Sequence, residues 1–448
     1  MERAELTKAG SLKGEITPPP DKSISHRAVM FASIAEGKSI VRNFLRAEDP
    51  ISTMNAFRML GIEIEEKIPP IPPLLKGGEG GFGGELIIHG KGLHGLKEPF
   101  DVINCGNSGT TVRLISGILS GNPFFSVLTG DDSLKQRPMA RVINPLKEMG
   151  ADISARNGDK YLPMAIKGRR LKATDYKMPV ASAQVKSCLI LAGLYADGTT
   201  TIIELQKSRD HTERMLKSMG ANIEIDGLIL RVKGQGSRVK ELSPIDVTVP
   251  ADFSSAAFFV AAALIIPNSE ILIKNAGINP TRTGLLDVLK KMGADIEIEN
   301  IRDVSGEPVA DIHCKTTSNL KAVKIGGDTM PSLIDEFPIL CVLATQAEGV
   351  TEIRGAEELR VKESDRIKAM AAELKKLGVE LEEYPDGISI KGKTSLKGNV
   401  VESYHDHRIA MSLAIAALAA QGATTINNPS CVDISFPGFY EELKRITR

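Results

Sequence analysis

Six apolar segments, each rich in small residues, recur along the chain and alternate with stretches that are mostly polar. Their apolar residues cover most of a helical turn instead of one narrow stripe. This pattern is typical of helices that are buried on most sides. The segments are residues 29–35, 112–119, 185–195, 256–266, 333–344 and 409–420. We therefore expect six buried helices at the centre of the fold.

A short polar motif precedes each apolar segment. The motifs begin at Asp21, Asn107, Ser182, Asp252, Asp328 and His405. They are rich in residues that cap helix N-termini, where free backbone N–H groups and the positive end of the macrodipole favour anions. Basic residues concentrate in or near several of these motifs: Lys22, Arg27, Arg113, Arg137, Lys186, Lys362, Arg366 and Arg408. The combination predicts a site for ligands that carry several negative charges.

A second pattern recurs five times, in which a glycine ends an amphipathic helix and an alternating strand follows. The glycines are Gly61, Gly150, Gly220, Gly293 and Gly378. Glycine suits the left-handed residue just past a helix, and the alternation suits a half-buried strand. Each repeated unit is then an apolar helix, a strand, an amphipathic helix and a strand pair.

The chain ends supply the sixth unit, with an amphipathic helix at 439–446 and a strand at 12–16. The pattern thus predicts an α/β fold of six repeated helix-strand units, three per domain. We expect a discontinuous domain of residues 1–21 plus 245–448 and an inserted domain of residues 22–244. A Pro-rich and then Gly-rich segment at about 68–84 reads as a flexible loop insertion.

Composition narrows the class of protein. The 448 residues are 42% hydrophobic, enough for a large core, and the 56 basic and 56 acidic residues cancel. We therefore expect no nucleic-acid partner and no membrane partner. The N-terminus has no signal-peptide pattern, and no apolar segment reaches the roughly 20 residues of a bilayer span, which predicts a cytoplasmic protein. The five cysteines are scattered without metal-ligand spacing, so we expect free thiols, mostly in the core, and no metal site.

The motifs, taken together and in order, resemble the signature set of the 5-enolpyruvylshikimate-3-phosphate synthase family. The resemblance runs from Leu12 to the final helix, apart from the inserted loop. It implies an inside-out α/β prism of two three-unit domains, the enolpyruvyl transferase fold, and a monomer that needs no cofactor. The segments that carry the resemblance are 21–28, 107–113, 137–139, 182–187, 360–366 and 406–408.

The resemblance also implies the reaction, a step of the shikimate pathway towards chorismate and the aromatic amino acids. The enolpyruvyl group of phosphoenolpyruvate is transferred to the 5-hydroxyl of shikimate 3-phosphate, with release of phosphate. Both substrates carry a phosphate and a carboxylate, which explains the demand for cationic side chains and for bidentate arginines.

Residue roles follow from the same resemblance. Phosphoenolpyruvate would be bound by Lys22, Gly109, Arg137, Gln184, Arg366 and Arg408. Shikimate 3-phosphate would be bound by Lys22, Ser23, Arg27, Ser182, Ala183, Gln184, Ser208, Asp335 and Lys362, with Arg209 added as the neighbour of Ser208. Glu363 would give a proton to the methylene carbon of phosphoenolpyruvate and later remove one. The 5-hydroxyl proton would pass to Asp335 or Lys22, and the sequence leaves open which of the two accepts it.

Two positions depart from the family pattern. Many members have a Lys where this chain has Ile434, and the Tyr often found near the shikimate phosphate has no clear counterpart around residues 208–211.

Three other functions fit parts of the pattern. An enolpyruvyl transferase acting on UDP-N-acetylglucosamine usually has a Cys on its mobile loop, and residues 134–138 contain none. A non-catalytic anion-binding repeat protein would explain the helix openings but not Asp335 and Glu363. A dehydrogenase is suggested by the G-x-G-x-x-G pattern at 78–83, but no strand leads directly into that segment and no helix follows it.

Overall fold

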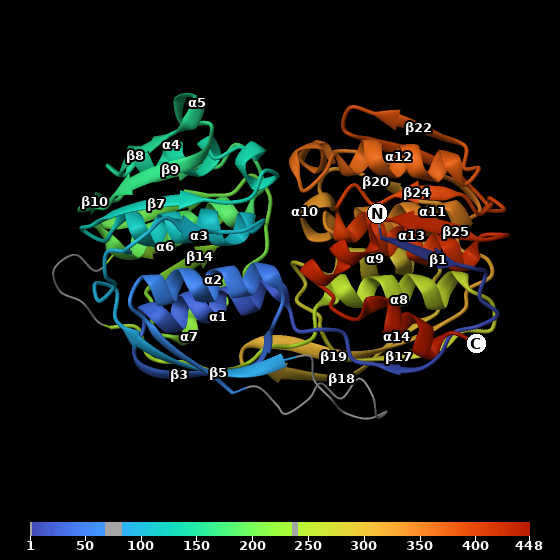
Figure 1. The fold of residues 1–448 in the computed structure, drawn as a ribbon, viewed down its shortest axis with the longest axis horizontal. Helices are drawn as coiled ribbons and strands as arrows, with labels where there is room; N and C mark the ends of the chain where they lie inside the picture. Colours follow the sequence, from blue (N-terminus) through green and yellow to red (C-terminus); the bar gives the residue numbers. More distant parts are fainter. Residues whose placement is uncertain (1, 68–82, 235–240) are drawn as a thin grey trace. The chain divides into compact units, whose positions relative to one another are not determined.

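The computed structural model describes residues 2–67, 83–234 and 241–448. The chain divides into two compact units (Figure 1). Unit 1 comprises Met1–Pro19, Pro250–Asp303 and Pro308–Arg448, and unit 2 comprises Pro20–Val249 and Val304–Glu307. The predicted loop insertion and the glycine pattern at 78–83 lie almost wholly outside the described residues.

Unit 2 is built around three buried helices that pack on one another. These are α1 (Lys22–Ile34), α3 (Gly109–Ser120) and α6 (Ala183–Tyr195). Beyond its first turn, each helix is buried over nearly its whole length, as the apolar pattern predicts. The amphipathic helices α2 (Glu48–Met59), α4 (Ala140–Glu148) and α7 (His211–Ser218) pack beside them.

Three four-stranded sheets complete unit 2, in the orders β16-β3-β5-β4, β6-β7-β9-β8 and β11-β13-β15-β14. A two-stranded pair, β10 (Leu171–Lys172) with β12 (Ala196–Asp197), accompanies them. The strands of the first sheet are β3 (Glu36–Leu45), β4 (Glu63–Lys67), β5 (Gly83–Lys91) and β16 (Asp246–Thr248). Those of the second are β6 (Ile103–Asn104), β7 (Phe125–Thr129), β8 (Asp152–Ala155) and β9 (Tyr161–Lys167). Those of the third are β11 (Asp175–Lys177), β13 (Thr199–Ile203), β14 (Ile223–Asp226) and β15 (Ile229–Lys233).

Unit 1 repeats this plan around α8 (Phe253–Ile265), α11 (Phe337–Gln346) and α13 (His407–Ala419), which pack on one another. Its amphipathic helices are α9 (Gly284–Lys291), α12 (Arg366–Lys376) and α14 (Phe439–Ile446). One sheet contains β2 (Lys13–Ile16), β17 (Glu270–Gly277), β18 (Ile296–Val304) and β19 (Glu307–Lys315). Another contains β20 (Lys324–Ile325), β21 (Gly349–Ile353), β22 (Leu381–Tyr384) and β23 (Gly387–Gly392). The third contains β1 (Arg3–Leu6), β24 (Val400–Glu402) and β25 (Thr424–Asn427).

The sheets share one pairing pattern, in which a parallel edge strand and an antiparallel partner flank a central strand. Strand β3, for example, pairs in parallel with β16 and antiparallel with β5, and β21 does the same with β20 and β23. The sheet that contains the first and last strands, β1 and β25, has three strands, since among the described residues no counterpart of β22 joins it. The structure therefore has the predicted six-unit α/β architecture.

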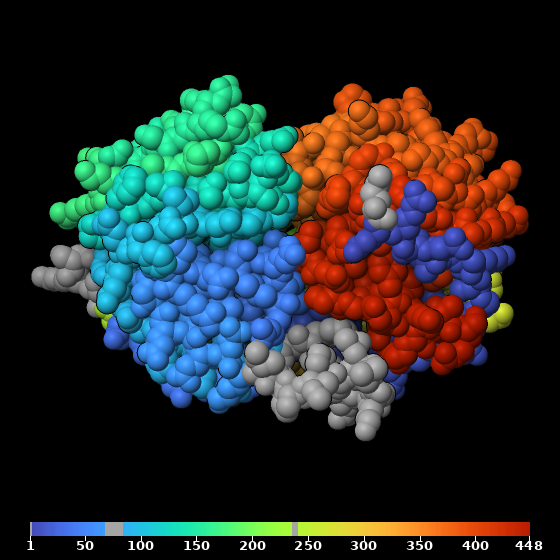
Figure 2. Space-filling view, in the orientation of Figure 1, coloured from blue at the N-terminus to red at the C-terminus, as the bar shows by residue number. Residues whose placement is uncertain are grey.

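The sheet membership of the N-terminal segment differs from the prediction. Residues 12–16 were expected to serve the sixth unit, but β2 pairs in parallel with β17 in the fourth. The strand that pairs with β25 is β1, nearer the chain start. Helix α14 does pack on β2, and Arg448 N donates to Ser11 O at 2.9 Å. In Figure 2 the dark blue N-terminal atoms accordingly lie against red C-terminal atoms.

The five repeated glycines have the conformation that their position predicts. Each follows the C-terminus of an amphipathic helix with φ between 78° and 92°. A side chain with a Cβ adopts this left-handed conformation only with strain, so glycine ends each helix and turns the chain into the next strand.

The prediction of one continuous helix over 333–344 is wrong, because the structure has two helices here. Helix α10 (Met330–Leu333) ends first, and α11 starts at Phe337 with Pro338 in its opening turn. Proline has no N–H and fits the start of a helix, so the chain breaks and restarts before it. Asp335 lies in this break.

The boundaries of the units also differ slightly from the predicted ones. Strand β16 pairs with β3, which carries unit 2 on to Val249. The tip of the β18–β19 hairpin, Val304–Glu307, also belongs to unit 2, where Glu307 Oε1 lies 2.7 Å from His211 Nδ1. In the described parts of the chain, no helix is long and apolar enough to cross a membrane.

Candidate active site

In unit 2, each of the three buried helices opens on a residue whose side chain caps it. Asp21 accepts from Ile24 N at 2.8 Å, Ser108 from Thr111 N at 3.1 Å, and Ser182 from Val185 N at 3.4 Å. The polar motifs therefore stand at the positive ends of α1, α3 and α6, as expected from their cap residues.

Two arginines converge on the first residue of α3. A Cβ built on Gly109 would lie 3.1 Å from an Arg113 Nη and 3.4 Å from an Arg137 Nη. Gln184, at the start of α6, accepts from Arg113 and donates to Thr110 Oγ1 at 3.0 Å. Gly109, Arg137 and Gln184, all predicted to bind phosphoenolpyruvate, are thus neighbours, and Arg113 joins them. The absence of a Cβ leaves room for an anion beside two guanidinium groups.

Lys22 and Arg27 both project from α1. Lys22 Nζ lies 3.1 Å from Asp49 Oδ2 in the first turn of α2. Arg27 is 3% exposed, and it donates to Thr212 Oγ1 at 2.7 Å and to Ser187 Oγ at 3.0 Å. Its other Nη donates to the carbonyl of Ser23 at 2.9 Å. Helices α1, α6 and α7 together therefore fix the Arg27 guanidinium.

The predicted phosphate-binding Ser208 lies in the segment between β13 and α7, and it is buried. Both its N–H and its hydroxyl donate to Glu204 Oε1. The next residue, Arg209, is half-buried. Ser182 and Ala183 lie at the N-terminus of α6, the helix that also carries Lys186.

In unit 1, the residues predicted for chemistry gather around the buried guanidinium of Arg366. Its Nε donates to Asp406 Oδ2 at 2.8 Å, and one Nη donates to Glu363 Oε2 at 2.7 Å. The other Nη lies 3.4 Å from Asp335 Oδ1. Burial alone would lower the pKa of Arg366, but Asp406, Glu363 and Asp335 raise it well above its ordinary value. A permanent cation thus sits among three carboxylates.

Arg408, in the first turn of α13, approaches the same group from another side. Its guanidinium donates to the carbonyl of Asp335 at 3.1 Å and lies 3.5 Å from Asp335 Oδ2. Lys362 and Glu363 occupy the turn that leads into α12, where both side chains are half-buried. The structure therefore brings Asp335, Glu363, Arg366 and Arg408 together.

Several members of these clusters carried no assigned role in the sequence. Asp406 caps α13 and accepts from two nitrogens of Arg366. Its place in a cap motif was a visible signal, but its long-range partner was not. Asp49, Ser187 and Thr212, which contact Lys22 or Arg27, have no sequence pattern that points to those pairings.

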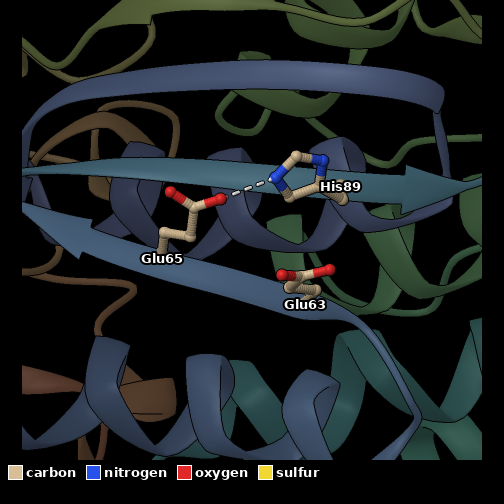
Figure 3. A group of neighbouring side chains, drawn as sticks. All are labelled: Glu63, Glu65 and His89. Atoms are coloured by element: carbon tan, nitrogen blue, oxygen red, sulfur yellow. Dashed lines mark hydrogen bonds and ion pairs between the residues drawn. The ribbon is translucent and has the colours of Figure 1, made fainter.

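Among the residues that the structure describes, two groups of surface side chains have ligand atoms close enough to hold a metal ion. Figure 3 shows one, in which Glu63 and Glu65 of β4 face His89 of β5. The second group is Glu297, Glu299 and His313, on β18 and β19. In each group the imidazole already contacts a carboxylate at 3.0 Å, Glu65 for His89 and Glu270 for His313. All the carboxylates are exposed, so cross-strand hydrogen bonds between imidazole and carboxylate account for the arrangement.

Comparison with known proteins extends over nearly the whole chain. The sequence profile of EPSP synthase (3-phosphoshikimate 1-carboxyvinyltransferase) matches residues 6–443. A 3-phosphoshikimate 1-carboxyvinyltransferase from Thermodesulfovibrio yellowstonii is 56% identical over 99% of both chains. One from Bacillus cereus is 50% identical over 98% of this chain and 97% of its own.

Solved structures agree with the sequence comparison. EPSP synthase from Acinetobacter baumannii superposes with a TM-score of 0.84 at 44% identity, covering 99% of this chain and 98% of that one. The enolpyruvyl transferase NikO from Streptomyces tendae is similar in fold, with a TM-score of 0.77 at 18% identity and coverage of 99% and 97%. The predicted enolpyruvyl transferase fold is therefore confirmed, and the chain belongs to the EPSP synthase family.

Proposed function

We propose that this protein transfers the enolpyruvyl group of phosphoenolpyruvate to the 5-hydroxyl of shikimate 3-phosphate and releases phosphate. The reaction belongs to the shikimate pathway and leads towards chorismate. The observation that carries the proposal is the family match over residues 6–443. The cationic helix openings of unit 2 and the arginine-held carboxylates of unit 1 suit substrates with phosphate and carboxylate groups.

The binding roles follow the two clusters. Ser23 and Arg27 hold the carboxylate of shikimate 3-phosphate, and its phosphate is taken by Ser182, Ala183, Gln184, Ser208 and Arg209. Lys22, Gly109, Arg137 and Gln184, with Arg366 and Arg408, hold phosphoenolpyruvate. Support comes from the convergence of Arg137 and Arg113 on Gly109, since guanidinium groups bind phosphate and carboxylate bidentately.

The chemistry is an addition followed by an elimination. The 5-hydroxyl oxygen attacks the central carbon of phosphoenolpyruvate while Glu363 gives a proton to the methylene carbon. Asp335 or Lys22 accepts the hydroxyl proton, and Lys362 and Asp335 orient the ring hydroxyls. Glu363 then removes a proton from the new methyl group as phosphate leaves, which restores the double bond.

The arginines of unit 1 support this division of work. Arg366 fixes Glu363 through one Nη at 2.7 Å, and Arg366 and Arg408 both contact Asp335. Two carboxylates that are held by cations in fixed positions can act at two different atoms of the reacting pair.

The test is phosphate release from purified protein given both substrates or either one, with mass detection of the product. We expect release to need both substrates, and Glu363→Gln to lower kcat by about 100-fold to 10,000-fold, the usual contribution of a general acid or base. Glu357→Gln, the same change at an exposed carboxylate nearby, should keep wild-type kcat. Turnover of UDP-N-acetylglucosamine instead would overturn the substrate, and no turnover of either would favour a non-catalytic anion-binding protein.

We also propose that the protein is a monomer that acts in the cytoplasm. Its five cysteines are all free, and four of them are buried. Free thiols are usual in a reducing compartment. Size-exclusion chromatography with light scattering should give the mass of one chain, 48.2 kDa, and a doubled mass would refute the monomer.

A further inference from the structure

Lys186, in the first turn of α6, has a fully buried side chain. Its ammonium lies 2.7 Å from Glu213 Oε1 and 3.1 Å from Glu204 Oε1. It also donates to the carbonyl of Ser208 at 3.1 Å. One lysine thus joins three pieces of unit 2: α6, the end of β13 with the segment after it, and the first turn of α7.

Burying this cluster has a large desolvation cost compared with filling the same space with apolar side chains. Moving charges out of water costs more than a buried pair usually returns, so apolar packing would serve stability at least as well. Here two carboxylates share one ammonium, and Glu213 Oε2 has no hydrogen-bond partner among the described residues. Burial raises the pKa of Glu213, whereas Lys186 acts to lower it. An arrangement of this kind suggests a role in positioning.

The residue that the cluster holds is Ser208. Glu204 Oε1 accepts from the Ser208 N–H at 3.0 Å and from the Ser208 hydroxyl. Lys186 Nζ donates to the Ser208 carbonyl oxygen. The backbone donor, the backbone acceptor and the side chain of Ser208 therefore all have partners in one buried network. The segment between β13 and α7 is thus fixed at Ser208. To bind phosphate, the Ser208 hydroxyl exchanges Glu204 Oε1 for a phosphate oxygen, while the N–H and the carbonyl keep their partners.

The contact between Lys186 and Glu204 also sets the local charge beside Ser208. Glu204 lies against Ser208 and is 6% exposed, so an unpaired carboxylate there would repel an approaching phosphate. The ammonium of Lys186, 3.1 Å from Glu204, offsets that charge from the buried side. Lys186 thus lets a carboxylate hold Ser208 without excluding an anion.

We propose that Lys186 is a positioning residue, which fixes Ser208 through Glu204 and neutralises Glu204, so that the segment accepts the phosphate of shikimate 3-phosphate. The inference rests on the proposed function, because it deepens the assignment of that phosphate site. Lys186 itself does not touch the substrate.

Three variants test the role: Lys186→Met, Glu204→Leu and the control Val232→Ala. Val232 is fully buried in β15 and lies near α6, so its truncation loosens the same region without touching the network. Steady-state kinetics give KM for each substrate and kcat, and calorimetry compares the binding of shikimate 3-phosphate with that of shikimate.

We expect Lys186→Met to raise KM for shikimate 3-phosphate by about 10-fold to 100-fold, because the Ser208 carbonyl loses its hydrogen bond to a charged group and Glu204 loses the cation that offsets its charge. KM for phosphoenolpyruvate should stay within about threefold. Affinity for unphosphorylated shikimate should hardly change, so the preference for the phosphorylated ligand should fall by the same factor. Val232→Ala should lower thermal stability and leave both KM values unchanged.

The role is refuted if Lys186→Met lowers only the fraction of active protein and leaves both KM values unchanged. It is also refuted if Val232→Ala raises KM for shikimate 3-phosphate by the same factor as Lys186→Met. Should Lys186→Met fail to fold, Glu204→Leu decides, since it removes the acceptor that holds Ser208 and should lower the preference for the phosphorylated ligand. An unchanged preference in that variant would refute the role. Wild-type protein that neither binds nor converts shikimate 3-phosphate would instead refute the proposed function.

Discussion

The buried imidazole of His26 ends a chain of hydrogen bonds that reaches the N-terminus of α3. His26 Nδ1 lies 2.7 Å from Thr53 Oγ1, which lies 2.7 Å from Thr111 Oγ1. The Thr111 hydroxyl donates to Ser108 Oγ, so it accepts from Thr53, which accepts from His26. The proton therefore sits on Nδ1 of a neutral ring. Nε2 is bare, and it has no partner in the described part of the chain.

At the residue scale, this arrangement predicts acid sensitivity. Burial first, and then Lys22 and Arg27, hold the pKa of His26 well below its ordinary value of 6.5. As pH falls below 6.5, the His26 imidazole therefore becomes protonated in the unfolded chain but stays neutral in the folded protein. Stability from this group is complete above that pH and declines towards the folded pKa, by at most about 1.4 kcal/mol per pH unit.

The measurement is urea denaturation, followed by circular dichroism, between pH 7.5 and 5. His26→Asn should lose less stability on acidification than the wild type, because this group no longer titrates. His405→Asn, at an exposed ring, is the matched control and should follow the wild type. Parallel pH curves for wild type and His26→Asn would contradict the prediction.

Single residues also show where sequence reasoning stops. Glycine positions and helix caps could be predicted, because each depends on a few neighbours in the chain. Asp406 and Arg366 are 40 positions apart, and Lys22 and Asp49 are 27 apart. Only the packing of the helices brings such partners together. The candidate residues were therefore accessible from motifs, whereas the carboxylates and hydroxyls that hold them were not.

At the scale of elements, the cap of α3 carries more than one bond. Ser108 Oγ accepts from both the N–H and the hydroxyl of Thr111, and the residue is fully buried. Ser108→Ala should therefore cost about 1 to 2 kcal/mol of unfolding free energy, the upper range for a lost cap. It should also loosen the helix start at Gly109.

Ser116→Ala is a control on the same helix. Its hydroxyl donates to the Val112 carbonyl four residues back, an interaction that adds little to helix stability. Urea denaturation should separate the two variants, and hydrogen exchange should be faster over the first turn of α3 in Ser108→Ala alone. Equal losses in both variants would show that the cap network adds nothing beyond an ordinary buried hydroxyl.

Helices and turns could be predicted where one sequence pattern was present, and not where an apolar pattern and a helix-breaking pattern overlapped. Buried helices followed from their apolar runs, and all five glycine turns appeared. Between α10 and α11 the apolar residues on either side indicated one helix, yet the charged pair Asp335 and Glu336 and the following Pro338 favoured a break. Hydropathy outweighed that signal in the prediction.

At the scale of the whole molecule, unit 1 is assembled from both ends of the chain. The N-terminal β1 pairs with β25, and β2 pairs with β17. A variant lacking residues 2–8 keeps Ala9, which donates to the Leu418 carbonyl, but loses β1. We expect amide exchange in β25 to become at least about tenfold faster, because its backbone groups lose their antiparallel partner.

Exchange in β13 and β15 of unit 2 should stay at the wild-type rate in the truncated variant. Glu5→Ala, which changes an exposed side chain of β1 and keeps the strand, should leave β25 protected. If β25 remained equally protected without β1, the strand would not matter for the stability of that sheet.

The repeat explains why the architecture could be predicted and why the register of the chain ends could not. Five similar units within one sequence define the sixth by analogy. The choice of partner for two short N-terminal segments depends on distant strands that the repeat pattern does not distinguish. Only the three-dimensional arrangement separates β1 from β2.

The discontinuity of unit 1 has a consequence for how the protein is made. A ribosome that has released residue 249 has supplied all of unit 2 except the hairpin tip at 304–307. The first two strands of the chain must still wait for β17 and β25. At about 5 to 20 residues per second, the 199 residues from 250 to 448 take about 10 to 40 seconds to translate. Strand β2 can pair once β17 at 270–277 has been made, whereas β1 has no partner until β25 at 424–427 follows.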